Sequence, residues 1–302
     1  MNQEVQPLEE WRNLLRVEGH RTVQASYGQA VVGSQTTWFD YVNDSTFPEL
    51  TAAFILTAEG KAIDGVSPKH FRLNPGEALH IDLEQWLKEV GLSHFVGGLF
   101  LVQRFEPPHH NEKKLIRDIM NSWHAGSHHA QFGNECDDQF NIKSRIGKYS
   151  FFMFCPAALS TDEMKTLAVV FNHSQDFDYN DTVAITPRLN DSSGNSWVGE
   201  PIAIKPFGFA AIDVERHFSQ FPFKKNQYYS LSVSHVGHRA IAMFFHVLRD
   251  SGAIITSRHT QPAACIFRPT EEDYFFNIMR EFKGWLPRGA VRFGKRLMGR
   301  PA

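Results

Sequence analysis

The sequence predicts an all-β protein made of two tandem β-sandwich units related by internal duplication, with short helices at the N- and C-termini. Short apolar or β-branched runs, separated by turns rich in Gly, Asn and Pro, extend over most of the chain. The aromatic content is high, with 26 Phe in 302 residues, which favours large β-rich cores. One short stretch also occurs twice, which predicts the duplication.

The repeated stretch is Ile-Asp-φ-Glu, where φ is apolar, at residues 81–84 and again at 212–215. The aspartates Asp82 and Asp213 are separated by 213 − 82 = 131 residues, and the prolines that precede them, Pro75 and Pro206, by 206 − 75 = 131. Each aspartate is expected either to lie in a strand or to cap the first turn of a helix. A catalytic pair of carboxylates would require that both copies react or that one has decayed.

The chain divides into four predicted segments. Residues 1–21 form an N-terminal helix or arm, and 22–135 form the first sandwich unit with a His-rich linker at its end. Residues 146–268 form the second sandwich unit, and 269–302 form an amphipathic basic tail. A chain of 302 residues is long for one core and sufficient for two.

Each predicted unit contains several short strands. In the first unit we expect strands at 30–32, 37–42, 50–57, 79–83 and 95–105. The pair Gly97-Gly98 indicates a β-bulge or a close approach of another chain segment. In the second unit we expect strands at 150–155, 167–171, 182–189, 202–204, 209–214, 228–234, 240–248 and 253–256.

The bulk properties exclude several classes of protein. A net charge of -2 gives no general attraction to nucleic acid. The three cysteines are few and widely spaced, which argues against a disulfide scaffold or a zinc ribbon. We also find no signal-peptide pattern and no apolar run long enough to span a membrane, so a cytoplasmic location is expected. Zincin, phosphate-loop, dinucleotide-binding and nucleophile-elbow motifs are absent from the sequence.

Histidines supply the main candidates for chemistry. Neutral imidazoles bind transition metals readily, so a site for one ion, Zn or Fe, is predicted between the two units. We expect His124, His128 or His129 to face a cleft shared with the second unit, with His259 or His246 opposite. The alternative is that these histidines are exposed or hydrogen-bonded for structural reasons. Either residues 115–120 form a helical turn or residues 115–123 form the closing strand of the first unit.

The ends of the two units share a second, weaker pattern. Ser-Trp-His at 122–124 and Ser-Arg-His at 257–259 are each followed by a glutamine. This pattern makes Trp123, Arg258, Gln131 and Gln261 the candidate binding residues. The spacing here is 259 − 124 = 135 residues, so the pattern requires a gap relative to the main repeat.

The tail combines aromatic and basic residues. Residues 271–286 are expected to form a helix with an aromatic face, and the residues after Pro287 are expected to be exposed. The predicted contacts with an anionic membrane or an acidic partner are Trp285, Arg288, Arg292, Lys295 and Arg296. The alternative is a C-terminal helix that covers a sheet edge.

These observations favour a non-enzymatic binding or accessory protein whose ligand is a glycan, a small molecule or a protein partner. One alternative is a metal-dependent enzyme with its His-rich site between the units. Another is a structural protein that docks to a membrane-associated partner through the basic tail. Nucleic acid is not expected as a partner.

Overall fold

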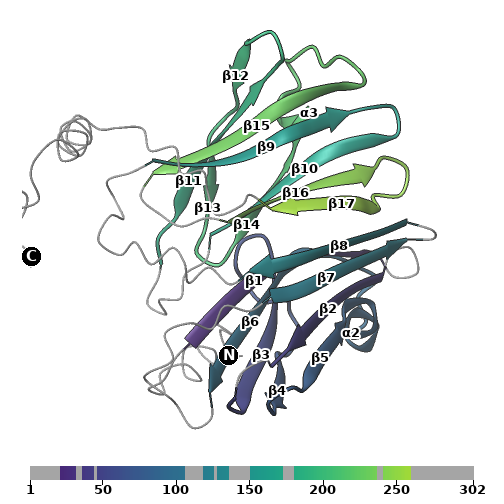
Figure 1. The fold of residues 1–302 in the computed structure, drawn as a ribbon, viewed down its shortest axis with the longest axis vertical. Coiled ribbons are helices and arrows are strands. Elements are labelled where there is room, and N and C mark those ends of the chain that lie inside the picture. The colour runs from purple at the N-terminus through teal and green to yellow at the C-terminus, as the bar shows by residue number, and fades with distance from the viewer. Residues whose placement is uncertain are drawn as a thin grey trace, which may run out of the picture.

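The computed structural model describes residues 21–31, 36–43, 46–105, 118–125, 128–135, 150–172, 180–236 and 241–259. In these residues the protein consists mostly of β-strands in antiparallel sheets, with two short helices (Figure 1). None of the described helices has the length and apolar character needed to cross a membrane. The predicted terminal helices, Gln261 and the five predicted contact residues of the tail lie outside the described residues.

The first half of the chain forms two four-stranded sheets with a short helix beside them. Its elements are β1 (Arg21–Val31), β2 (Thr36–Val42), β3 (Glu49–Leu56), β4 (Lys69–Leu73), β5 (Ala78–Asp82), α2 (Leu83–Glu89), β6 (His94–Phe105), β7 (Asp118–Ala125) and β8 (His128–Glu135). One sheet has the order β1-β6-β3-β4 and the other β5-β2-β7-β8. Both sheets are antiparallel throughout.

The second half forms one larger sheet. Its elements are β9 (Ser150–Ser160), β10 (Met164–Phe171), β11 (Val183–Asn190), β12 (Ser196–Val198), β13 (Ile202–Ile204), β14 (Phe209–Asp213), α3 (Val214–His217), β15 (Gln227–Val236), β16 (Ile241–Leu248) and β17 (Ile254–His259). The order is β12-β11-β15-β9-β10-β16-β17, with β13 on β11 and β14 on β10. A single register pair, Lys165 with Ser160, joins β10 to β9.

The two halves have the same order of strand neighbours. Strand β2 lies between β5 and β7, with β8 beyond, and β10 lies between β14 and β16, with β17 beyond. Strand β6 lies between β1 and β3, and β4 pairs with β3. In the same way β15 lies between β9 and β11, and β13 pairs with β11. We call two positions corresponding when they occupy the same place in this order of strands.

The repeated aspartates occupy corresponding strand-to-helix junctions. Asp82 ends β5 and caps α2, where its carboxylate accepts a hydrogen bond from the backbone N–H of Gln85 at 2.9 Å. Asp213 ends β14 and caps α3, where it accepts from the N–H of Arg216 at 3.2 Å. Of the two interpretations predicted for these residues, the structure shows the helix cap rather than a mid-strand position. Both carboxylates satisfy helix N-terminal N–H groups, which explains the repeat without catalysis.

Two buried asparagines hold corresponding turns. The Nδ2 of Asn43 donates to the carbonyl of Leu73 at 3.0 Å, and the Nδ2 of Asn172 donates to that of Ile204 at 2.9 Å. The backbone of each also bonds to the turn before β5 or β14. The carbonyl of Asn43 accepts from the N–H of Gly76 at 2.7 Å, and that of Asn172 accepts from Phe207 at 2.7 Å.

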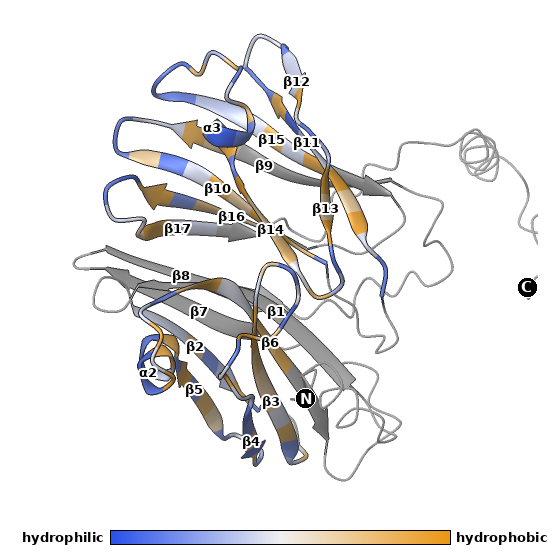
Figure 2. Cartoon of the chain, turned by 180° about the vertical axis from the view of Figure 1, so that it is seen from behind, coloured by the Kyte–Doolittle hydropathy of each residue, from blue (hydrophilic) through white to orange (hydrophobic). Residues whose placement is uncertain are grey.

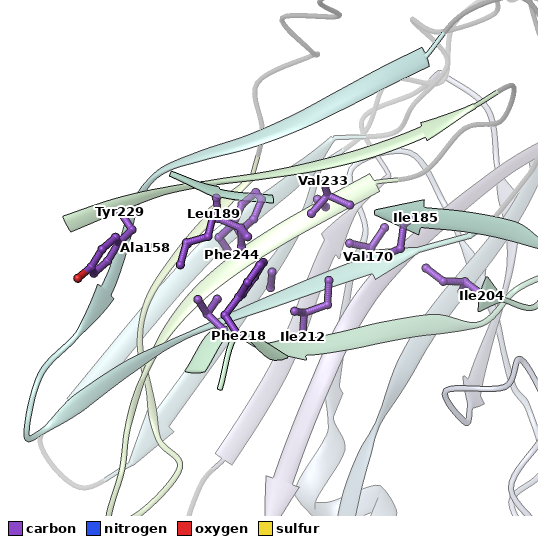
Figure 3. Close-up of a cluster of buried hydrophobic side chains, with 14 of the residues drawn as sticks. Ala158, Val170, Ile185, Leu189, Ile204, Ile212, Phe218, Tyr229, Val233 and Phe244 are labelled. Carbon is purple, nitrogen blue, oxygen red and sulfur yellow. The ribbon is translucent and has the colours of Figure 1, made fainter. Parts of the chain in front are cut away.

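Alternating side chains of the central strands build three apolar layers. The first layer fills the sandwich of the first half and includes Ile55 of β3 and Leu99 of β6. The third fills the second half and includes Val170 of β10 and Phe244 of β16 (Figure 3). The middle layer joins the halves, and its members are Ala52, Phe54, Leu56, Phe100, Val169, Phe171, Phe207, Phe209, Met243, Phe245, Val247 and Ile254. Hydrophilic residues gather instead on α3 and on the turns (Figure 2).

The glycine pair in β6 allows a close approach and does not form a bulge. The register of β6 against β1 is continuous through both glycines, and its register against β3 is continuous up to Gly98. A Cβ placed on Gly97 would lie 2.6 Å from the carbonyl oxygen of Leu56, and one on Gly98 would lie 3.4 Å from the ring of Phe171. Of the two predicted explanations for the pair, close packing is therefore the correct one.

The described parts of the segment predicted to be a His-rich linker are strands. Residues 118–125 form β7 and residues 128–135 form β8, and the two pair as a hairpin. The alternative closing strand, predicted at 115–123, is therefore the better interpretation. Strand β8 also lies alongside β17 of the second half (Figure 1).

Candidate binding face

The outer face of the sheet β5-β2-β7-β8 carries a group of polar and aromatic side chains. On β2, Phe39 and Tyr41 are buried in the first apolar layer, so the alternate residues point outward. The outward residues of β2 and its neighbour β5 define a surface that we call the Trp38 face: Thr36, Trp38, Asp40, Val42, Ala78 and His80. Val42 is 51% exposed.

An aspartate and a histidine are paired on the Trp38 face. The register places Asp40 opposite His80, and Nδ1 of His80 lies 2.6 Å from Oδ1 of Asp40. The histidine ring also contacts Trp38, with 5.9 Å between the ring centroids. The side chains of His80 and Asp40 are 57% and 44% exposed. The face thus offers a carboxylate, an imidazole and a half-buried indole to a ligand.

A second polar group borders this face where α2 begins. The hydroxyl of Thr36 donates to Oε2 of Glu84 at 2.9 Å, and Nζ of Lys88 lies 2.7 Å from Oε1 of the same carboxylate. Glu84 is the second acidic residue of the repeated stretch, and it is mostly buried. Both of its oxygens are engaged, so it shapes the border of the face.

Strand register adds some of the predicted site positions to this face. Position 124 lies opposite Thr36 and position 122 opposite Trp38. On β8, His129 is opposite His124, and Gln131 is opposite position 122. Positions 124, 129 and 131 are therefore aligned in register with Thr36 and Trp38, whereas Trp123 is aligned with Thr37.

Of the five predicted metal ligands, His246 is the one whose ring contacts the structure describes. His246 uses both ring nitrogens, with Nε2 at 2.9 Å from the carbonyl oxygen of Ala157 and Nδ1 at 3.0 Å from the hydroxyl of Thr256. His259 pairs with Met243 in the register, three positions along β16 from His246. Among the described residues no group of three potential ligands is suited to a metal ion. A Zn or Fe site that includes His124 and His129 stays a prediction.

The second predicted pattern joins strands that do not correspond. Residues 122–124 lie in β7, between β2 and β8, whereas 257–259 lie in β17 at the end of its sheet. The strand that corresponds to β7 is β16. Trp123 and Arg258 are therefore not equivalent positions, and the similarity of the two tripeptides is a coincidence of composition. Arg258 lies opposite Phe244 in the register, and Trp123 lies opposite Thr37.

A charged cluster in the second half has a structural role. The guanidinium of Arg249 donates from Nη1 to Oε2 of Glu215 at 2.8 Å and from Nε to the carbonyl of Thr161 at 2.8 Å. Hydrogen bonds from Arg249, with a further one from Ser160, hold the pKa of Glu215 below its ordinary value, although partial burial raises it. This network ties α3 to the turns at Thr161 and Arg249, and all of its strong acceptors are engaged.

The corresponding face of the second half is apolar and buried. Where the first half pairs Trp38 with position 122 and Asp40 with position 120, β10 and β16 pair Leu167 with Phe245 and Val169 with Met243. These residues belong to, or pack against, the middle layer that joins the halves. In the second half this face is therefore a docking surface for a sheet, whereas in the first half it is polar and exposed.

Sequence reasoning missed Trp38, Asp40 and His80. The available signal was the alternation in β2, where Trp38-Phe39-Asp40-Tyr41 places an indole and a carboxylate on one side of the strand and two core aromatics on the other. An aromatic residue on the outward side of a half-buried strand suggests recognition.

Comparisons with known proteins identify no family. No family model matches the chain, and no curated protein matches it. Among solved structures, it is similar to a glycosyl hydrolase family 2 member from Bacteroides cellulosilyticus DSM 14838, with 7% identity, TM-score 0.19, and coverage of 80% of this chain and 28% of that chain. A Bacteroides uniformis beta-glucuronidase gives 11% identity, TM-score 0.19, and coverage of 80% and 26%. The chain thus spans about a quarter of the length of these enzymes, and TM-scores this low carry no argument about function.

Proposed function

We propose that the protein is a non-enzymatic binding or accessory protein that recognises a protein partner through the Trp38 face. One observation carries this proposal. The corresponding face of the second half is covered by a sheet of the first half, whereas the Trp38 face is exposed and has Trp38, Asp40 and His80 in place of an apolar surface. The equivalent face of the second half therefore already binds a sheet of the first half within the same chain.

We infer further that the chain is two copies of one sandwich unit, spanning about residues 22–135 and 146–268. The shared order of strands, the capping by Asp82 and Asp213, and the turns held by Asn43 and Asn172 support this inference. In the stack of two units, the outer face of β3 and β6 in the first half contacts the outer face of β10, β14 and β16 in the second half. Such a stack leaves one face of each unit exposed.

The chemistry of the Trp38 face suits a flat protein surface. A tryptophan surrounded by polar groups is typical of the residues that dominate binding energy at interfaces. The Asp40–His80 pair supplies charge that orients a partner, because charged groups at an interface mainly determine specificity and association rate.

A glycan is the second candidate ligand. The ring of Trp38 next to the carboxylate of Asp40 and the imidazole of His80 combines an apolar plane with hydrogen-bonding groups. Sugars present the same combination of apolar and hydroxyl-bearing surfaces, and amphipathic aromatic residues suit them.

A photo-cross-linker tests the proposed face in the organism that makes the protein. A benzophenone amino acid replaces the exposed Val42 on the Trp38 face, with the exposed Val96 of β6 as the matched control position. We expect a protein adduct at position 42 that is lost with Asp40→Arg and not formed from position 96. Equal adducts from both positions, or an adduct insensitive to Asp40→Arg, would contradict the proposal. Binding to a glycan array that Trp38→Ala abolishes, without a protein adduct, would favour the glycan.

A further inference from the structure

We infer that the protein partner is a second copy of this chain, and this inference rests on the proposed function. The second copy would present the outer face of β11 and β15, which we call the Arg188 face: Thr186, Arg188, Asn190, Tyr228, Ser230 and Ser232. The two chains would associate head to tail and repeat the stacking that already joins the two halves.

The junction between the two halves of one chain provides the template for docking a second copy. The outer face of β3 and β6 contacts β10, β14 and β16 through the middle apolar layer. Phe100 of the first half lies edge to face with Phe171 of the second, with 6.2 Å between their ring centroids. The two surfaces are the outer face of a β1-β6-β3 sheet and the outer face of a β14-β10-β16 sheet.

The same two types of surface are exposed at the ends of the molecule. The Arg188 face corresponds to the outer face of β3 and β6, because the pair Phe54–Phe100 has its counterpart in Arg188–Ser232 and the pair Leu56–Gly98 in Asn190–Ser230. The Trp38 face corresponds to the buried outer face of β10, as shown above. Tyr228 at the edge of the Arg188 face is 62% exposed.

A pair of turns supports the same arrangement. Within the chain, the turn around Gly60 docks on the turn before β14: the N–H of Phe209 donates to the carbonyl of Ala58 at 2.9 Å, and a Cβ on Gly60 would lie 2.2 Å from the carbonyl oxygen of Pro206. The corresponding turns are those of Gly194 and Gly76, both with positive φ. A Cβ on either of these glycines would meet nothing within 4 Å. One uncovered turn of each kind is thus available to a second copy.

The charges of the two exposed faces are complementary. Arg188 occupies the place of Phe54, and Asp40 occupies the place of Val169, whose side chains share the middle apolar layer. A copy that docks in the intrachain manner therefore brings a guanidinium and a carboxylate into the same layer, where the intrachain junction has apolar side chains. Polar groups make such a contact reversible, whereas the apolar junction within the chain is permanent.

The symmetry of this contact determines the assembly. Because the two surfaces differ, the contact is heterologous, and such contacts build open-ended arrays unless the rotation closes a ring. Average mass should therefore rise continuously with protein concentration and should not stop at a dimer. Salt should oppose the assembly, because it screens the charge pair.

Analytical ultracentrifugation of the full chain over a range of concentrations tests the inference. Wild type should show a mass that rises with concentration. Asp40→Arg and Arg188→Asp should each weaken association about tenfold or more, and the double variant Asp40→Arg/Arg188→Asp should restore it. Lys225→Ala, which removes an exposed cation from outside both faces, is the control. Circular dichroism checks that each variant is folded.

Two results overturn the inference. One is a wild-type mass that equals one chain at every concentration, and the other is a double variant that is no better than the single ones. Either result leaves the proposed function standing if position 42 still cross-links to a different protein and Asp40→Arg abolishes that adduct. Loss of that adduct as well would end both.

Discussion

The imidazole of His217 lies directly against Gly199. A Cβ placed on Gly199 would lie 2.4 Å from Nε2 and 2.6 Å from Cδ2 of this histidine. Nε2 is buried and has no hydrogen-bond partner among the residues that the structure describes. The ring also lies edge to face with Phe218, with 5.2 Å between the centroids, so it has little room to withdraw.

We expect Gly199→Ala to lower the free energy of unfolding, because the new methyl group would overlap the imidazole. Overpacking of this kind costs about 1–3 kcal/mol. In a His217→Ala background the same substitution should cost less than about 0.5 kcal/mol, since the overlapping atoms are gone. Chemical denaturation of the four proteins of this double-mutant cycle measures the coupling. Equal costs in the two backgrounds would show that the contact is absent.

Burial also makes His217 a source of acid instability. Partial burial lowers the pKa of His217 from its ordinary value of 6.5, and a backbone hydrogen bond to Glu200 opposes the shift only in part. Above about pH 6.5 the ring is neutral in both states and contributes no pH dependence. As the pH falls below this value, the unfolded chain takes up a proton before the folded one does, so the free energy of unfolding falls.

His217→Gln should therefore flatten the loss of stability between about pH 6.5 and pH 5. Denaturant unfolding at several pH values measures it, with the exposed His94→Gln as control. A His217→Gln protein with the same pH dependence as wild type would contradict the burial of this ring.

The buried asparagines should be costly to remove. Asn172→Ala would leave the carbonyls of Asp181 and Ile204, both 2.9 Å from Nδ2, without this donor. Each buried acceptor that loses its partner costs about 1–3 kcal/mol. We expect the same direction for Asn43→Ala, and a small effect for Asn190→Ala, whose amide makes contacts of 3.5 Å on a polar face. Thermal unfolding of the three variants ranks them, and a cost for Asn190→Ala equal to that for Asn172→Ala would refute the assignment.

The middle apolar layer should make the two halves unfold together. Phe171→Ala removes a fully buried ring at the junction and should cost about 3–5 kcal/mol. Because the layer is shared, amide exchange should become faster to a similar extent for Leu99 in the first half and Leu231 in the second. A change confined to Leu231 would show that the halves are energetically independent.

Much of the strand pattern could be predicted from the sequence, because strands with one buried face alternate clearly. Strand β11 is the best example: its burial alternates from Val183 to Asn190. The Asp82 and Asp213 caps were also predictable, since aspartate is favoured at helix N-termini. The segments of β7 and β8 show a weak strand pattern because they contain three histidines, two asparagines and one glutamine.

The junction between the halves also has a pattern in the sequence. Strand β3 contains a continuous run of buried residues from Thr51 to Leu56, and β10 contains a second from Ala168 to Phe171. A continuous apolar run indicates a strand that is buried on both faces. The Trp38 face could not be predicted, because it depends on which strands are neighbours across the sheet.

Hydroxyl-radical footprinting of dilute and concentrated protein tests most directly whether a second copy of the chain docks on the Trp38 face. Tryptophan, tyrosine and histidine side chains are oxidised where they are exposed, and mass spectrometry locates the change. We predict protection of Trp38 and His80 on one face and Tyr228 on the other in concentrated protein, with no protection of the exposed His94. Protection confined to other surfaces, or equal oxidation at both concentrations, would contradict docking at this face.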